Sequence, residues 1–317
     1  MKNIYSNIQK NNNKNLSKAI KYLKINQLVG VPTETVYGLA GNAYSQSSIK
    51  KIFKLKKRPK INPLIIHYYN YKSAEKDVFL NKNFFKLYNK LCPGPITFIL
   101  KKKKNSRISQ LATANLDTVA IRFPKHSSIR FILKKTNFPL AIPSANKSGG
   151  VSPVKSKDVE EEFGNKLKLI IDGGKCRIGL ESTVIDLSDK LKILRPGLIN
   201  SKKIGKIIRA KVLMNKNFQK IKSPGSLKKH YSPGIPMKLN QKKPTNDCAF
   251  ITFGKKYSQK KNFFNLSKNA NLNEAARNLY SVLRKIKKNK YKKICVVKIP
   301  NKNIGVAINN RLKHAAS

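Results

Sequence analysis

Short apolar runs recur through the middle of the chain and limit the folds it can adopt. Each run is bounded by polar residues, glycine or proline, which is typical of β-strands and too short for most helices. They lie at residues 63–67, 96–100, 119–123, 140–142, 169–171, 184–187 and 191–194. Because few long helical patterns interrupt them, the sequence predicts an α/β domain built on one large mixed sheet.

Two helical patterns precede these runs, with a strand predicted between them at residues 27–31. The apolar face of the first helix consists of Leu16, Ala19, Ile20 and Leu23. That of the second consists of Ile49, Ile52 and Phe53. Hydrophobic residues at this spacing indicate amphipathic helices that pack on a sheet. Ser47 is the expected cap of the second helix.

The pattern changes after Gly197. A lysine-rich stretch leads to two segments rich in proline and glycine, at 223–225 and 230–234, which indicate a linker. Strands are then expected at 249–253 and 294–299, on either side of one helix. The apolar face of that helix is formed by Ala275, Leu279, Val282, Leu283 and Ile286.

Asn271, followed three residues later by Glu274, resembles a capping box at the start of this last helix. The pattern as a whole predicts a small β-α-β domain at the C-terminal end. We therefore expect a first domain at residues 1–197, a linker at 198–235 and the small domain at 236–317.

The charge of the chain is extreme. It has 68 Lys and Arg residues against 14 Asp and Glu residues, a formal net charge of +54. Such a balance favours an anionic partner such as RNA or nucleotide phosphates. Lysine is spread over the whole chain beside many asparagines and isoleucines, however, and compositional drift would produce the same pattern. Charge alone does not identify a function.

Several classes of protein are disfavoured. The cysteines are far apart and form no CxxC pair, which argues against a zinc site and a disulfide framework: they are Cys92, Cys176, Cys248 and Cys295. No apolar run approaches the ~20 residues that span a membrane, and the N-terminal residues lack the apolar core of a signal peptide. We expect a cytoplasmic protein with reduced thiols, no membrane association and no metal site of its own.

Polar residues follow the predicted strands, where open α/β sheets bind ligands. Residues 32–39, PTETVYGL, form a Thr- and Glu-rich turn that would also suit an ordinary helix cap. Lys56 and Arg58 begin a cationic segment that continues to Asn62 and ends at His67. Cations there suit a triphosphate, because arginine offers a bidentate fork and lysine a point charge. A lone histidine is more often structural.

Three further segments share this position. Arg122 lies on the face of its strand opposite the apolar side chains, because strand side chains alternate. It could clamp a carboxylate, or that face could simply be solvated. The loop at 143–149, PSANKSG, could donate to phosphate oxygens or form a plain polar turn. Paired glycines at 173–174 let the backbone approach a ligand, and Arg195 adds a cation at another strand end.

Taken in this order, the segments resemble the YrdC-type L-threonylcarbamoyladenylate synthase family. The shared motifs are PTETVYGL, K-x-R-P…NPL…H, T-V-A-x-R-x-P, P-S-A-N-x-S-G and G-x-E-S-T-V-[IV]-D. The tail, SPG-x4-HYSP followed by NEAARNLY…INNRL, resembles the long form with an appended C-terminal domain. The resemblance implies a YrdC-like twisted mixed sheet with a concave basic active site, plus a small C-terminal α/β (Rossmann-like) domain.

The resemblance also implies the reaction: L-threonine, bicarbonate and ATP give L-threonylcarbamoyladenylate and pyrophosphate, for threonylcarbamoyladenosine modification of tRNA. By motif position, threonine would be bound by Thr35, His67, Arg122, Ile142 and Ser182. ATP would be bound by Arg58, Asn62, Thr118, Ser144, Asn146, Ser152, Arg195 and Tyr231. The residues expected to be catalytic are Lys56, Arg58 and Arg195, which would meet charge developing on the phosphate oxygens.

The chain departs from the family's commonest pattern at Lys57, where glycine is usual, at Lys175, and at residues 226–227. Mg²⁺ would be carried by the ATP oxygens, and the linker would fold back as a lid over a labile carbamate. The product would pass to the tRNA-modification machinery, and weak RNA binding is expected. The alternatives are a non-catalytic RNA-binding protein that uses a basic YrdC-like platform and another carbamoyl-transfer enzyme.

Overall fold

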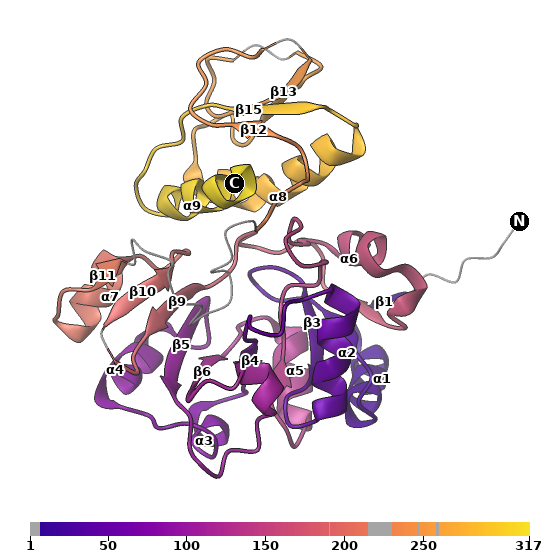
Figure 1. The fold of residues 1–317 in the computed structure, drawn as a ribbon, viewed down its shortest axis with the longest axis vertical. Coiled ribbons are helices and arrows are strands. Elements are labelled where there is room, and N and C mark those ends of the chain that lie inside the picture. The colour runs from indigo at the N-terminus through magenta and orange to yellow at the C-terminus, as the bar shows by residue number, and fades with distance from the viewer. Residues whose placement is uncertain (1–6, 190, 215–229, 246, 258–259) are drawn as a thin grey trace, which may run out of the picture.

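The computed structural model describes residues 7–189, 191–214, 230–245, 247–257 and 260–317. Two domains stack on one another, each around its own sheet (Figure 1). The larger has an 11-stranded mixed sheet in the order β1-β8-β2-β3-β7-β4-β6-β5-β9-β10-β11. The smaller has a four-stranded parallel sheet in the order β12-β15-β13-β14.

The large sheet is made of short strands. They are β1 (Ile8–Lys10), β2 (Val29–Val31), β3 (Gly38–Asn42), β4 (Ile65–His67), β5 (Ile96–Lys101), β6 (Thr118–Arg122), β7 (Leu140–Ala141), β8 (Ile170–Asp172), β9 (Thr183–Asp186), β10 (Lys192–Arg195) and β11 (Leu213–Met214). The helices of this domain are α1 (Asn13–Lys24), α2 (Gln46–Lys56), α3 (Tyr71–Ala74), α4 (Lys82–Leu91), α5 (Ser127–Lys135), α6 (Ser156–Phe163) and α7 (Ser201–Ile208), with 3-10 turns η1 (Gln110–Thr113) and η2 (Gly164–Lys166). The small domain consists of β12 (Met237–Lys238), β13 (Cys248–Thr252), β14 (Phe263–Asn265), α8 (Leu272–Lys288), β15 (Lys293–Val296) and α9 (Gly305–Ala316).

The predicted fold class is confirmed. The seven apolar runs of the first domain correspond to β4 to β10, and the two helical patterns to α1 and α2. The buried residues of α1 are the four apolar ones that the spacing selected, and they pack with α5 against one face of the sheet. A second, larger core continues from the other parts of this domain into the small one.

Three local predictions need correction. Helix α2 is capped by Ser45, not Ser47: the helix begins at Gln46, and the Ser45 hydroxyl accepts from the Ser48 N–H at 3.2 Å. The PTETVYGL turn does not cap a helix but leads into β3, which pairs antiparallel with β2. Asn271 does cap α8, but Glu274 accepts from the Ser267 hydroxyl, so the reciprocal half of a capping box is not formed.

The predicted linker contains regular structure. Helix α7 packs on α4, and β11 pairs with β10, so residues 201–214 extend the larger domain. The segment at 223–225 and the departure at 226–227 lie outside the described residues. The chain is described again from His230, and Ser232 forms a bridge with Gly150 of the large domain.

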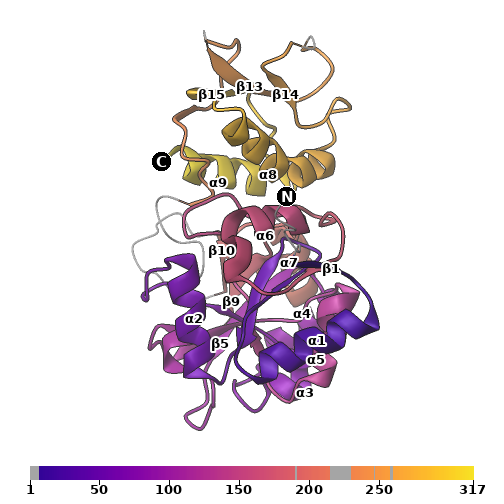
Figure 2. The ribbon, with the colours of Figure 1, turned by 90° about the vertical axis from the view of Figure 1, so that its right-hand side faces the viewer.

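Helices α8 and α9 lie on the side of the small sheet that faces the large domain (Figures 1 and 2). The backbone of α8 comes so close to Gly179 that a Cβ there would be 2.5 Å from the Arg277 Cα. Gly179 also has φ +79°, so glycine is required by both backbone conformation and space. Within the part of the chain described here, no helix is both long and apolar enough to cross a bilayer.

Candidate active site

One pocket of the large domain brings together residues from seven separate segments. Its volume is about 50 Å³. It is lined by Thr35, Val36, Arg58, Leu64, Ile65, Arg122, Ile142, Pro143, Ser144, Glu181, Arg195, His230 and Tyr231. Three guanidinium groups line this pocket with one carboxylate, and all four groups are buried. The arrangement suits an anionic ligand.

Arg122 is held by a carboxylate that the sequence reading did not select. Its Nη2 donates to Glu34 Oε1 at 2.7 Å, and the backbone N–H of Lys125 donates to the other oxygen at 3.1 Å. Burial alone would raise the pKa of Glu34, but the Arg122 guanidinium lowers it below its ordinary value. The Nε of Arg122 is buried without a hydrogen-bond partner among the described residues. One edge of the guanidinium is therefore fixed, and a donor remains for a ligand.

His67 lies beside Arg122, because β4 and β6 are parallel neighbours with these two residues in register. Its Nδ1 is 3.2 Å from the carbonyl oxygen of Ile65. Burial, together with the nearby Arg122 charge, lowers the pKa of His67 well below its ordinary value. His67 is therefore neutral in the folded protein at neutral pH.

Arg58 and Asn62 form a second fixed pair. Arg58 Nη2 donates to Asn62 Oδ1 at 2.6 Å and to the Pro63 carbonyl at 2.7 Å, while Nε donates to the Asn62 carbonyl at 2.9 Å. These bonds orient the guanidinium toward the pocket wall. The Nδ2 of Asn62 is buried and has no partner among the residues described. An unpaired buried donor of this kind is costly unless a ligand or water meets it.

Lys56 holds the loop that contains Ser144 and Asn146. Its Nζ donates to the Ser144 carbonyl at 2.6 Å and to the Asn146 carbonyl. Burial, then the neighbouring Arg58 charge, lowers the pKa of Lys56 well below its ordinary value. An arriving polyphosphate would favour the charged form again. Asn146 Oδ1 is also buried without a partner within the described ranges.

Arg195, the last residue of β10, bonds to Ser182, which precedes the neighbouring strand β9. Its Nε donates to the Ser182 carbonyl and its Nη2 to the Ser182 hydroxyl, both at 3.1 Å. The Ser182 and Thr97 hydroxyl oxygens are 2.7 Å apart. Ser182 is thereby fixed just before the start of β9, next to the guanidinium that lines the pocket.

Glu181 joins the pocket to the small domain. Its carboxylate accepts from the Ser152 hydroxyl at 2.6 Å, from the Tyr280 hydroxyl at 2.9 Å and from Arg311 Nε at 2.8 Å. The Arg311 guanidinium also lies 5.0 Å from the centroid of the Tyr231 ring. Side chains of α8 and α9 therefore support the pocket from the other domain.

Apart from Thr118, the predicted site residues fall into two groups. The pocket lining contains Thr35, Arg58, Arg122, Ile142, Ser144, Arg195 and Tyr231. Lys56, Asn62, Asn146, Ser152 and Ser182 lie behind it, where they bond to lining residues or to their loop, and His67 lies beside Arg122 on the neighbouring strand. Thr118 is at the opposite end of β6 from Arg122, four residues or roughly 13 Å along an extended strand. The structure does not bring it to the pocket.

Sequence reasoning missed Glu34, Tyr280 and Arg311, and it gave Glu181 no role. It assigned His230, with Tyr231, to the lid over the nucleotide. Glu34 and Glu181 stand inside motifs that were recognised, and acids are rare in this chain. Their rarity was the available signal. Within the described ranges, no group of three or more His, Cys, Asp or Glu residues is placed to hold a metal ion.

A large mixed sheet with a buried pocket of three arginines defines a class of protein: an α/β protein whose pocket suits an anionic ligand. Residues 21–197 match the Sua5/YciO/YrdC family, described as telomere recombination. Residues 199–317 match the family described as threonylcarbamoyl-AMP synthase, C-terminal domain. The chain belongs to the threonylcarbamoyl-AMP synthase family, and it is an ATP-using nucleotidyltransferase that forms threonylcarbamoyl-AMP for tRNA modification.

Individual relatives cover nearly the whole chain. The threonylcarbamoyl-AMP synthase of Pyrococcus abyssi is 34% identical over 94% of this chain and 93% of its own length. That of Bacillus subtilis is 34% identical over 96% of this chain and 94% of its own. The crystal structure of P. abyssi Sua5 complexed with L-threonine has a TM-score of 0.88, with 32% identity, 95% coverage of this chain and 94% of that one.

Proposed function

We propose that the pocket converts L-threonine, bicarbonate and ATP into L-threonylcarbamoyladenylate and pyrophosphate. The observation that carries the proposal is the meeting of two residue sets in one pocket. Thr35, Arg122 and Ile142, expected for threonine, line it together with four residues expected for ATP. A pocket that holds both substrates can align them for reaction, which is the main requirement of phosphoryl-type transfer.

At the threonine end, Arg122 pairs with the substrate carboxylate. Glu34 fixes one edge of the guanidinium, and the unpartnered Nε supplies a charge-assisted donor. Ile142, buried at 5% exposure, gives the substrate methyl group an apolar contact. Thr35, His67 and Ser182 orient the remaining polar atoms.

At the nucleotide end, Arg58 and Arg195 bind the phosphates, and Tyr231 and Ser144 complete the contact surface. Asn62 and Asn146 each keep one unpartnered buried side-chain atom close to this end. Lys56 fixes the loop of Ser144, and Ser152 acts through Glu181. Thr118, at the other end of β6 from Arg122, is the predicted ATP contact that lies farther along this strand.

The chemistry needs little covalent help from the protein. The threonine amine and bicarbonate form a carbamate with loss of water, and a carbamate oxygen attacks the α-phosphorus while pyrophosphate leaves. The carbamate is already anionic, so no general base is required. Arg58 and Arg195 lower the barrier by meeting charge that develops on the phosphate oxygens, and Lys56 adds positive charge from behind the Ser144 loop that it fixes.

Mg²⁺ is carried to the pocket by ATP. The one carboxylate of the lining, Glu181, is occupied by Ser152, Tyr280 and Arg311. The donors in the pocket are otherwise mainly cationic and do not suit a dedicated cage. Coordination by phosphate oxygens and water is the usual arrangement for this ion.

The predicted linker acts as a lid through His230 and Tyr231. Both are buried, both line the pocket, and the pocket volume of about 50 Å³ is far below the roughly 300–1,000 Å³ of small-molecule sites. Substrates can therefore enter only if these residues move away. Tyr231→Ala is expected to raise the KM for ATP and to uncouple ATP cleavage from product formation. Unchanged KM and coupling would contradict the lid.

The product is used in the cytoplasm by a tRNA-modification enzyme, and the basic surface gives weak, salt-sensitive RNA binding. The deciding experiment measures pyrophosphate release by the purified chain while threonine, bicarbonate and ATP are omitted in turn. Release only with all three supports the synthase. Arg58→Ala and Arg122→Ala should each lower kcat/KM by roughly 10- to 100-fold, from loss of one charge-assisted contact.

Arg209→Ala is the matched control, because Arg209 is an exposed arginine at the end of α7. It should leave turnover unchanged. Absence of turnover in the parent chain, combined with tight salt-sensitive tRNA binding, would instead support the non-catalytic RNA-binding alternative.

A further inference from the structure

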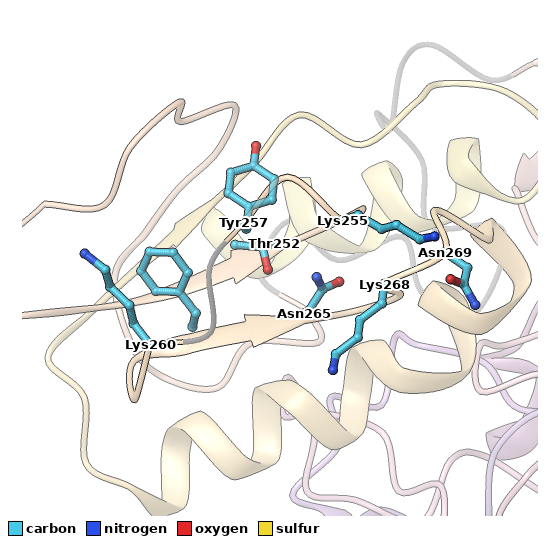
Figure 3. A pocket seen from close by; sticks show the side chains of 8 residues that line it. Thr252, Lys255, Tyr257, Lys260, Asn265, Lys268 and Asn269 are labelled. Atoms are coloured by element: carbon cyan, nitrogen blue, oxygen red, sulfur yellow. The ribbon is translucent and has the colours of Figure 1, made fainter.

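The small domain contains a second pocket that shares no residue with the active site. It lies where β13 and β14 end, and its volume is about 510 Å³. It is lined by Thr252, Lys255, Tyr257, Lys260, Phe263, Asn265, Lys268 and Asn269 (Figure 3). The volume is within the roughly 300–1,000 Å³ typical of small-ligand sites, and parallel sheets bind ligands beyond the carboxyl ends of their strands.

Thr252 is the residue that requires an explanation. It is fully buried, and its hydroxyl has no hydrogen-bond partner among the described residues. A buried hydroxyl without a partner is unfavourable, and native proteins seldom keep one without a reason. Because Thr252 lines the pocket, a ligand there would supply the missing partner.

The pocket floor is fixed by neighbouring strands. Thr252 and Asn265 are the last residues of β13 and β14 and are in register, and their side chains face one another in Figure 3. The Asn265 amide donates to the Gly254 carbonyl at 2.9 Å and accepts from the Ser267 N–H at 3.0 Å. These bonds fix the turns that form the rim, so the hydroxyl lies in a preformed site.

The charge of the lining residues indicates the sign of the ligand's charge. Lys255, Lys260 and Lys268 are exposed at the rim, and the lining includes no carboxylate. Lysine is so common in this chain that three lysines alone would carry little weight. Combined with a buried hydroxyl that lacks a partner, they favour a compact anion such as phosphate, for which lysine acts as a point charge.

Two aromatic rings complete the wall. Tyr257 and Phe263 both pack edge-on against the buried Phe250, with ring centroids 5.7 and 5.1 Å away. Exposed parts of such rings give a nucleobase a stacking surface. The cavity thus combines hydrogen-bond donors for a phosphate with an aromatic wall for a base, and these match the two ends of a mononucleotide.

We propose that this pocket binds a phosphate-bearing small molecule of nucleotide size, with its phosphate at Thr252 and the lysines and its base against the rings. A buried hydroxyl at the end of two strands serves one terminal phosphate better than the continuous backbone of a nucleic acid. For this reason the ligand is a free nucleotide. The pocket shares no lining residue with the catalytic pocket, so the two sites are separate.

The test counts binding sites on the full chain by equilibrium dialysis with α,β-methylene-ATP, which cannot be cleaved at the reacting bond, and with AMP. The parent chain should bind two equivalents. Arg58→Ala should remove the catalytic equivalent. Thr252→Val should weaken the other by roughly 10- to 100-fold, as expected for a lost hydrogen bond to a charged group. Thr252→Ser keeps the hydroxyl and should bind normally.

Two controls separate this proposal from the proposed function. Thr252→Val should leave threonine-dependent pyrophosphate release unchanged, and it should leave Tm unchanged or raised, because the lost hydroxyl had no partner in the protein. A single equivalent in the parent chain, or a second equivalent that survives Thr252→Val, would overturn the proposal. So would a loss of tRNA-fragment affinity in Thr252→Val when no nucleotide binds, since that outcome identifies a nucleic-acid surface.

Discussion

The ion pair between Arg311 and Glu181 is a buried polar link between the two domains, and Arg311→Met tests what it contributes. The Arg311 side chain is fully buried, and its Nε lies 2.8 Å from Glu181 Oε2. Methionine keeps most of the volume and removes the charge, so the variant leaves the Glu181 carboxylate in place without its main partner. The change should loosen the small domain and the pocket together.

The magnitude follows from the pKa of Glu181. Burial alone would raise that pKa, but Arg311 and then Arg195 lower it from the ordinary 4.5 to about 2. At 1.36 kcal/mol per pKa unit, this difference corresponds to about 3 kcal/mol of stability. Removing one partner of a buried ion pair typically costs about 3–5 kcal/mol, which agrees. We expect Arg311→Met to lower the free energy of unfolding by about 3 kcal/mol.

The pH dependence of stability gives an independent measure of the ion pair's contribution. A carboxyl whose pKa is lowered by folding stabilises the protein above the unfolded-state pKa, and this stability is lost as pH falls through the folded-state value. The parent chain should therefore lose about 3 kcal/mol between pH 4.5 and pH 2 on account of Glu181. Arg311→Met should show a smaller loss, because the group that lowers the pKa of Glu181 most is gone and only Arg195 and the Ser152 hydrogen bond remain to lower it.

The assay is urea unfolding followed by tyrosine fluorescence at pH 7 and at intervals down to pH 2. Lys288→Met is the matched control: it breaks the 3.3 Å pair with Glu161, whose side chains are 76% and 52% exposed. Exposed pairs contribute about 0–1 kcal/mol. If Arg311→Met cost no more than this control, or kept the parent's acid sensitivity, the reasoning would be refuted.

Three further predictions follow from the same structure. Lys57 occupies the left-handed C-cap of α2 at φ 50°, so Lys57→Gly should raise the free energy of unfolding by about 1 kcal/mol, measured in urea. Burial lowers the pKa of His67, so its neutral form is kept in the fold while the unfolded chain gains a proton below about pH 6.5. Stability should fall from pH 7 to 5.5, and His67→Gln should reduce that slope. Chelation of Mg²⁺ by EDTA should abolish pyrophosphate release without changing Tm, because the ion arrives with ATP; added Mg²⁺ should restore release.

Much of the fold was predictable because short apolar runs between turn residues indicate β-strands. Strand β3 was missed because its sequence, GLAGN, contains two glycines and resembles a turn. Pairing with β2 on one side and β7 on the other holds it extended. Helix α4 did carry a signal: Phe84, Leu87 and Leu91 repeat at helical spacing after the cap Asn81.

The structure brings seven of the predicted site residues into one pocket, but the sequence did not predict the side chains that hold them. Arg122 was selected from its strand position, but the carboxylate that fixes it, Glu34, is 88 residues away in sequence. Arg311 is 130 residues from Glu181 and in the other domain. Periodicity and turn chemistry describe only local structure, so contacts of this separation depend on how the domains pack. Thr118 differs from these residues: motif position predicts an ATP contact for it, and it does not line the pocket.

In a chain with 68 cationic and 14 acidic residues, the position of an acid says more about tertiary contacts than the position of a lysine does. A lysine has many possible reasons to be where it is, whereas a buried acid must be matched by donors to be tolerated. Asp77 accepts from the hydroxyls of Tyr44, Tyr68 and Ser106, while Glu34 and Glu181 each hold an arginine of the pocket or of its support. Each acid thus fixes a junction between segments far apart in sequence. For strongly basic chains in general, the few acids within motifs are therefore the first residues to examine, and reversing a surface lysine should matter far less than neutralising any one of these three carboxylates.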